Sequence, residues 1–258
     1  MKLFNEIFDA VISLGCTCRC AKHLSSMSLR QFSSPFDWVM GSTFECRIDM
    51  LCTGFSKYLK YENLVPREDS PDSCEGHRSV DDVKYGFAFL HDFPNLRDVA
   101  ETYPAVKAKY DRRIKRLLDV LHGDNRVCFV WWSHDQVVDD AVLIESIERI
   151  DRVFKARIDF LIIENGPSKT PELHRLAEDR IVRIRCSLVT SEYDLFGDKR
   201  RCRKIFLALR VKGCRWKQLS RSFRLGLSNL LSFYIPSRRL RRRFRDFLRS
   251  GFLESYEY

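Results

Sequence analysis

Apolar runs and stretches of helical spacing alternate along most of the chain. The apolar runs predict strands at residues 9–15, 85–93, 126–132, 158–165 and 181–186. Apolar residues at helical spacing predict helices at residues 20–29, 103–123, 139–156 and 171–180. Strands separated by helices are typical of βαβ units, so the expected fold class is three-layer α/β with a mainly parallel sheet.

The composition is that of a globular chain. Of its 258 residues, 45% are hydrophobic and 12% aromatic, which is enough for a sizeable core. No apolar run is long enough to span a bilayer, and Glu6 and Asp9 interrupt the first apolar segment, which argues against a signal sequence. We therefore expect a cytoplasmic protein whose ten cysteines are reduced thiols.

The net charge of +10 is unevenly distributed along the chain. Residues 199–250 contain 18 Lys and Arg but one acid, Asp246, whereas residues 1–198 contain 27 basic and 32 acidic side chains. This step in charge predicts two parts, an α/β domain at residues 1–198 and a basic helical C-terminal extension at residues 199–258.

The basic extension contains an amphipathic segment at residues 237–253. Its apolar side chains fall on one helical face among arginines, and they are Leu240, Phe244, Phe247 and Leu248. This pattern is typical of a helix in a membrane interface, where each basic residue contributes about 1 kcal/mol near anionic lipid. We expect peripheral attachment to the inner face of the membrane; nucleic-acid binding is less favoured, and a lid on the protein body is the alternative.

The stretch VISLGCTCRCAKHL (11–24) carries three cysteines at alternate positions. Gly15 ends the first predicted strand, and the residues after it form the turn into a helix, which is where function gathers in parallel sheets. Backbone N–H groups at a helix start stabilise a thiolate, so we expect a cysteine here to have a lowered pKa and to act as a nucleophile. Two histidines that end strand-like runs and precede an acid are candidate bases: His91 (before Asp92) and His134 (before Asp135).

Three short motifs resemble a known family. They are Ser-Leu-Gly-x-x-Cys at residues 13–18, Pro-Phe-Asp-Trp at residues 35–38 and His-Asp-Phe at residues 91–93. In this order they are similar to a bacterial domain family catalogued as “putative papain-like cysteine peptidase”, and the resemblance covers roughly residues 10 to 190. It implies that Cys18 is the family cysteine and that His91 with Asp92, rather than His134, completes the pair.

The resemblance also implies an activity. Hydrolysis or acyl transfer would pass through a thioacyl intermediate on Cys18, with His91 as general base and then general acid. The backbone of the turn from Gly15 to Cys20 would form the oxyanion hole. Further candidates for orienting the imidazole or binding substrate are Asp37, Trp38, Asp92, His134 and Asn165.

A weaker resemblance concerns the turn alone. A strand, a glycine turn, a cysteine and a helix are similar to the arrangement in capsule-polysaccharide biosynthesis proteins thought to be acyltransferases, and in serine esterases. This resemblance implies a small-molecule or peptide substrate, with envelope or polysaccharide precursors as one class. A papain-like fold would place the cysteine helix against an antiparallel barrel, whereas the alternation of elements favours a parallel sheet; we take the fold from the alternation and the site from the motifs.

The same residues have structural alternatives. Cys18 can be a buried thiol and His91 a core histidine, while the Pro-Phe-Asp-Trp segment can pack and cap a loop. Cysteines and histidines at residues 16–23 and 74–77 suggest zinc, but alternate spacing lacks the two-residue gap of structural zinc ligands, so we expect no metal and no cofactor. The competing function class is a non-catalytic binding protein associated with membrane or nucleic acid.

Overall fold

The computed structural model describes residues 2–67, 76–133, 136–188, 198–213, 237 and 240. The chain divides into two compact units, Met1–Lys212 and Gly213–Tyr258. All helices and strands named below lie in the first unit, including α5 (Lys199–Leu207), which begins where the basic part of the sequence begins. The C-cap of α5 is followed by Val211, which bridges to Phe8 near the N-terminus.

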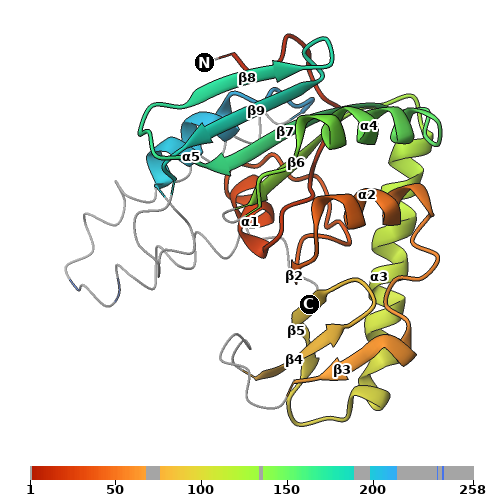
Figure 1. Cartoon of the computed structure of the whole chain (residues 1–258). Coiled ribbons are helices and arrows are strands. Elements are labelled where there is room, and N and C mark those ends of the chain that lie inside the picture. The colour runs from red at the N-terminus through yellow and green to blue at the C-terminus, as the bar shows by residue number, and fades with distance from the viewer. Residues whose placement is uncertain are drawn as a thin grey trace. The chain divides into compact units, whose positions relative to one another are not determined.

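A five-stranded sheet forms the centre of the first unit (Figure 1). Its strands, in spatial order, are β1 (Ala10–Ser13), β6 (Arg126–Ser133), β7 (Arg157–Asn165), β9 (Ile181–Cys186) and β8 (Glu172–Leu176). The first four strands are parallel, and β8 alone in this sheet pairs antiparallel. The expected α/β class with a mainly parallel sheet is therefore confirmed.

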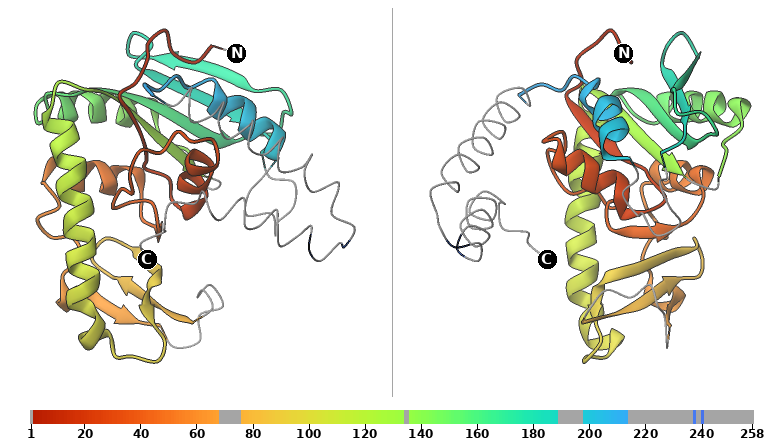
Figure 2. Two further views of the ribbon diagram at one scale, coloured as in Figure 1. Left: turned by 180° about the vertical axis from the view of Figure 1, so that it is seen from behind. Right: turned by 90° about the vertical axis from the view of Figure 1, so that its left-hand side faces the viewer.

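Helices cover both faces of this sheet, because neighbouring residues of a strand point to opposite faces. Trp131 of β6 meets Phe44 of α2 (Phe44–Cys52) with ring centroids 5.5 Å apart. Trp132 meets His23 of α1 (Cys18–Ser26) at 5.2 Å and Phe206 of α5 at 6.1 Å. Helix α4 (Asp140–Asp151) packs with α2, so α1 and α5 lie on one side of the sheet and α2 and α4 on the other (Figure 2).

The prediction of a helix at residues 171–180 is wrong. Residues Glu172–Leu176 form β8, which pairs with β9 in a hairpin, and Ala177, Glu178 and Asp179 make the turn with positive φ angles. The segment has good helix formers, but pairing with β9 supplies hydrogen bonds that outweigh a weak local preference. Its side chains are mostly exposed, as is usual for a polar strand at the edge of a sheet.

A second, antiparallel sheet carries the predicted strand at residues 85–93. Its order is β2 (Val39–Gly41), β5 (Phe87–Pro94), β4 (His77–Asp82) and β3 (Leu64–Pro66), with a short 3-10 helix η1 (Tyr61–Asn63) before β3. The expectation that residues 85–93 belong to the βαβ series is therefore wrong, because β5 pairs with β2 and β4 and with no strand of the parallel sheet.

The long helix α3 (Val99–His122) packs against β5 (Figure 1). It buries one stripe at spacings of three and four residues, formed by Val99, Thr102, Val106, Tyr110, Arg113, Leu117 and Leu121. The stripe includes a tyrosine and an arginine, and both belong to the polar groups beneath the candidate site. Helix α3 therefore supports the strand that carries His91.

The amphipathic segment expected at residues 237–253 lies outside the described residues, apart from Ser237 and Leu240. Leu240 is 55% exposed. In the part of the chain that the structure describes, no helix is both long and apolar enough to cross a membrane. Attachment of the extension to a membrane stays a prediction.

Candidate functional site

The turn between β1 and α1 is built around Gly15. A Cβ atom on this residue would lie 2.7 Å from Cβ of Cys20, so only glycine lets the turn pass so close to the helix. The thiol of Cys20 is buried and donates to the carbonyl of Val130 at 3.7 Å, and burial raises its pKa to about 12. The thiol of Cys16 donates to the carbonyl of Trp132 at 3.4 Å. Both neighbours of Cys18 in the motif are therefore turned toward β6.

Cys18 is the first residue of α1 and is half-buried. Thr17 is the N-cap, and its hydroxyl accepts from the N–H of Arg19. Burial raises the pKa of the Cys18 thiol, while the charges of Lys22 and Arg19 and the residue's own N–H act in the opposite direction. The expectation of a lowered pKa at this helix start is thus wrong, because removal of the thiolate from water outweighs the stabilisation by the helix end.

The backbone donors near the thiol differ in availability. The N–H of Gly15 donates to the hydroxyl of Ser13 at 3.2 Å, and the N–H of Arg19 donates to Thr17. The N–H of Cys18 faces its own sulfur and would stabilise a negative charge there. Of these three N–H groups, that of Cys18 is therefore the one left to stabilise an oxyanion.

His91 lies on β5, and strand β2 connects β5 to the turn that precedes Cys18. The N–H of Gly41 in β2 donates to the carbonyl of Cys16 at 2.9 Å, and β2 pairs with β5. The His91 ring meets the edge of Trp38 at 5.9 Å between centroids. Burial lowers the pKa of His91 below its usual 6.5, and the neighbouring charge of Asp92 opposes this shift. The imidazole is therefore neutral at pH 7, the form that a general base requires.

The charge of Lys22 affects both candidate catalytic groups. Lys22 lies four residues after Cys18, on the same face of α1, and its charge lowers the pKa of both Cys18 and His91. Among the described residues, the Cys18 thiol makes no hydrogen bond to another residue. Cys18 and His91 therefore share Lys22 as a nearby charge and are not joined by a hydrogen bond.

Asp92 points away from His91, as alternation along a strand requires. One carboxylate oxygen accepts from Nζ of Lys109 at 2.6 Å, and the other accepts from the hydroxyl of Tyr110 at 2.9 Å. Both partners belong to α3. The expected role of Asp92 in orienting the imidazole through a hydrogen bond has no support in this geometry, although its charge still acts on His91.

Trp38 contacts His91, and its neighbour in the chain, Asp37, is buried. Asp37 is 1% exposed and accepts from the N–H of Ser34 at 3.1 Å, from its hydroxyl at 2.8 Å and from Nη1 of Arg30 at 3.1 Å. Burial raises its pKa despite these partners. The guanidinium of Arg30 lies 5.5 Å from the centre of the Trp38 ring. Asp37 therefore holds Arg30 in place, and Trp38 contacts both Arg30 and His91.

Of the two remaining candidates, Asn165 is not brought to this neighbourhood. Asn165 ends β7 and is exposed, and β6 lies between β7 and β1. Ser13 at the end of β1 is level with Val130 and Leu161, so Asn165 lies two strands across and four residues further along, roughly 15 Å away. His134 lies outside the described residues, and its role stays a prediction.

The described part of the chain contains no set of side chains that could bind zinc. There, no three His, Cys, Asp or Glu side chains lie close enough to hold a metal ion. The ring of His23 stacks on that of Phe206 with centroids 5.5 Å apart, whereas the thiol of Cys20 is buried against β6. The alternating cysteines and His23 therefore do not point to one metal site. Cys74 lies outside the described residues, and the eight described cysteines are free thiols.

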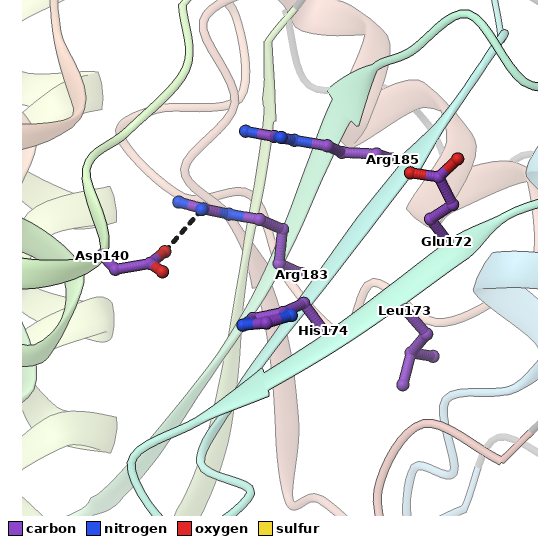
Figure 3. A pocket seen from close by; sticks show the side chains of 6 residues that line it. All are labelled: Asp140, Glu172, Leu173, His174, Arg183 and Arg185. Carbon is purple, nitrogen blue, oxygen red and sulfur yellow. Dashed lines mark hydrogen bonds and ion pairs between the residues drawn. The ribbon is translucent and has the colours of Figure 1, made fainter.

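A pocket of about 230 Å³ lies on the opposite face of the sheet, between β8, β9 and the start of α4 (Figure 3). It is lined by Asp140, Glu172, Leu173, His174, Arg183 and Arg185. Arg183 pairs with Asp140 and with the fully buried Glu164, and Arg185 also pairs with Glu164 at 2.9 Å. These charges largely compensate one another, and the pocket contains no cysteine.

Comparison with known proteins assigns the chain to a family. A family model described as “Putative papain-like cysteine peptidase” matches residues 9–163, a range that includes Cys18 and His91. A protein of Acanthamoeba polyphaga mimivirus, named only as uncharacterized, is 26% identical over 176 residues, which cover 61% of this chain and 78% of that relative. No solved structure matches the chain. Because the family model matches more than half of the chain, the chain belongs to the family described as “putative papain-like cysteine peptidase”.

Proposed function

We propose that this protein is a cysteine-dependent hydrolase or acyltransferase with Cys18 as nucleophile and His91 as general base. The observation that carries the proposal is the position of Cys18 as the first residue of α1, within the residues that the family model matches. A half-buried thiol at a helix start and a half-buried neutral imidazole are the two groups that acyl transfer requires.

The shifts of both pKa values describe the resting state. The thiol pKa is raised and the imidazole pKa is lowered, so the pair rests as neutral thiol and neutral imidazole at pH 7. His91 then takes the proton as sulfur attacks the acyl carbon, and gives it to the leaving group as the thioester forms. Water or an acceptor hydroxyl attacks the thioester in the second step, with His91 again as base. The N–H of Cys18 stabilises the oxyanion in both steps.

The proposal is tested by trapping the thioester. Incubation with 4-nitrophenyl butyrate followed by acid quench and peptide mass spectrometry should find the butyryl group on Cys18. The His91→Gln variant should acylate at least about 100-fold more slowly, because general-base catalysis contributes about 10²- to 10⁴-fold. The Cys52→Ser variant is the matched control, because Cys52 is a half-buried free thiol at the end of α2.

Acylation spread over several cysteines at equal rates would refute the proposal. So would a rate that stays the same in His91→Gln. The Cys18→Ser variant checks that the label reports this residue, since it should remove the modified peptide while leaving the fold intact.

We also propose that the basic extension attaches the protein to anionic membrane. The support is its composition, 18 basic side chains against one acid between residues 199 and 250. Vesicles containing phosphatidylserine should sediment with the protein, and neutral phosphatidylcholine vesicles should not. Binding that an added duplex DNA abolishes, and that falls steeply with salt, would favour a nucleic-acid partner instead.

A further inference from the structure

The polar groups beside Cys18 and His91 are mostly cations. Arg19 and Lys22 are the charged residues of α1, which has no acid. Beneath the site, the two aspartates Asp37 and Asp92 face more cations than they can neutralise. Asp92 pairs with Lys109, and Asp37 with Arg30.

Arg113 adds a further buried positive charge at this place. It is 8% exposed, its guanidinium lies 5.0 Å from the centre of the Tyr110 ring, and its charge lowers the pKa of Asp37. Its Nη1 atom is enclosed and makes no hydrogen bond to a described residue. Asp37 therefore faces two guanidinium groups, and the local balance of charge is positive.

Arg30 is the cation in this group that can bind a ligand. It is fixed on two sides, by Asp37 at 3.1 Å and by the face of Trp38 at 5.5 Å. Its side chain is 14% exposed. Within the described residues no hydrogen bond reaches its Nε or Nη2, and neither atom is enclosed. A guanidinium held rigid, with two donors left open to the surface, is suited to a carboxylate or phosphate group.

We propose that Arg30 binds an anionic group of the substrate, so that the enzyme prefers acyl donors with a carboxylate or phosphate near the reacting carbonyl. This inference rests on the proposed function, because it places the charged group relative to Cys18 and His91. Trp38 contacts both Arg30 and His91, so an anion bound by Arg30 would lie near the general base. The charge of Lys22, which acts on both Cys18 and His91, also attracts an anion.

The test compares acyl donors that differ in charge. The probes are 4-nitrophenyl hydrogen glutarate, which carries a carboxylate, and 4-nitrophenyl butyrate, which is neutral. A charged hydrogen bond corresponds to about 10- to 100-fold in kcat/KM, so the wild type should prefer the glutarate ester by that factor at low salt. The preference should fall as salt screens the charges.

Two variants of Arg30 separate binding from folding. Arg30→Gln removes the charge and should abolish the preference for the anionic ester. Arg30→Lys keeps the ion pair with Asp37 but lacks the planar fork, so it should fold normally and still lose several-fold of the preference. Arg152→Gln is the matched control, because Arg152 is 73% exposed at the end of α4 on the opposite face of the sheet.

The outcomes distinguish the inference from the proposed function. Turnover that depends on Cys18 but shows no preference for the anionic ester, or a preference that survives both Arg30 variants, overturns the inference alone. No Cys18-dependent turnover of either ester overturns the proposed function and the inference with it. Since the ratio of the two esters is the readout, a general loss of active protein does not imitate the expected result.

Discussion

At the scale of the residue, Cys18 and His91 are both shifted by burial toward their neutral forms. The thiol has a raised pKa and the imidazole a lowered one. A thiolate–imidazolium pair would need both shifts to have the opposite sign. The nucleophile is therefore made in the reaction step by proton transfer, and the resting protein should not show an unusually reactive thiol at neutral pH.

Alkylation of Cys18 by iodoacetamide tests this expectation. The thiolate is the species that reacts, and the thiol pKa lies above 9.0, so the rate should rise about tenfold per pH unit from pH 7 to pH 9 without a plateau. Peptide mass spectrometry gives the rate for each cysteine. His91→Ala should change it less than about threefold, because a neutral imidazole does not stabilise the resting thiolate. A plateau below pH 8 that His91→Ala removes would show a preformed ion pair.

Asp92 gives a second prediction at this scale. Its charge raises the pKa of His91, so Asp92→Asn should lower that pKa further and move the acid limb of kcat/KM to lower pH. The change also weakens the contacts to Lys109 and Tyr110, at a cost of about 1–3 kcal/mol in the free energy of unfolding.

A control variant at Tyr110 separates the effect of the Asp92 charge from the effect of its packing contacts. Tyr110→Phe loses the hydrogen bond to Asp92 but keeps the carboxylate, so it should lower the free energy of unfolding by about 1 kcal/mol and leave the acid limb in place. Urea unfolding and pH–rate profiles are the two measurements. An acid limb that moves equally in both variants would assign the effect to disturbed packing of β5 on α3.

At the scale of the element, the turn from β1 into α1 depends on close contact between Gly15 and Cys20. A Cβ on residue 15 would lie 2.7 Å from Cβ of Cys20, and one of them must move. Gly15→Ala should therefore lower the free energy of unfolding by about 1–3 kcal/mol and displace the start of α1 that carries Cys18.

A double-mutant cycle identifies the cause. Cys20→Gly removes the clashing Cβ together with a buried thiol, and the cost of this change alone cancels in the cycle. In that background Gly15→Ala should cost much less than in the wild type, giving a coupling energy of about 1 kcal/mol or more in urea unfolding. Additive effects of the two changes would mean that Gly15 serves the backbone conformation and not the contact.

The elements also show what the sequence predicts and what it does not. Long apolar runs such as β6 and β7, buried on both faces, were predicted as strands from their composition. The strand β8 was predicted as a helix, because five polar and mixed residues at an edge carry no strand pattern until β9 pairs with them. The antiparallel sheet was missed for a similar reason: β2 and β3 are three residues long, too short to show alternation.

The sequence predicts only part of what surrounds the candidate residues Cys18 and His91. Short motifs gave Cys18 and His91, but sequence does not show that Asp92 faces α3 or that burial shifts the thiol pKa upward. Both depend on residues distant in the chain. Lys22 could have been found from its spacing of four from Cys18 on one helix face. Arg30 carried no such signal, since its place beside Trp38 comes from the fold of the loop between α1 and β2.

At the scale of the whole molecule, the two candidate catalytic residues come from different parts of one compact unit. Cys18 is on a helix at the end of the parallel sheet, and His91 is on a strand of the antiparallel sheet. Helix α1 packs against β1 and β6 of the parallel sheet, as the alternation of elements predicts, rather than against an antiparallel barrel. The carbonyl of Cys16 bound by Gly41 is one of the links between the two sheets.

The packing of α5 determines where the chain can be shortened from its C-terminal end without loss of stability. The step in charge predicts a boundary near residue 198, whereas the first compact unit extends to Lys212. Phe206 of α5 is fully buried and stacks on His23, while Trp132 lies beneath both. A chain ending after Lys212 should keep the free energy of unfolding of the first unit, but a chain ending at residue 198 exposes this aromatic group. Removing a buried Phe side chain alone costs about 3–5 kcal/mol, so the shorter chain should unfold at distinctly lower urea concentration or aggregate. Equal stability of the two chains in urea unfolding followed by tryptophan fluorescence would show that α5 belongs to the extension and contributes nothing to the core around Trp132.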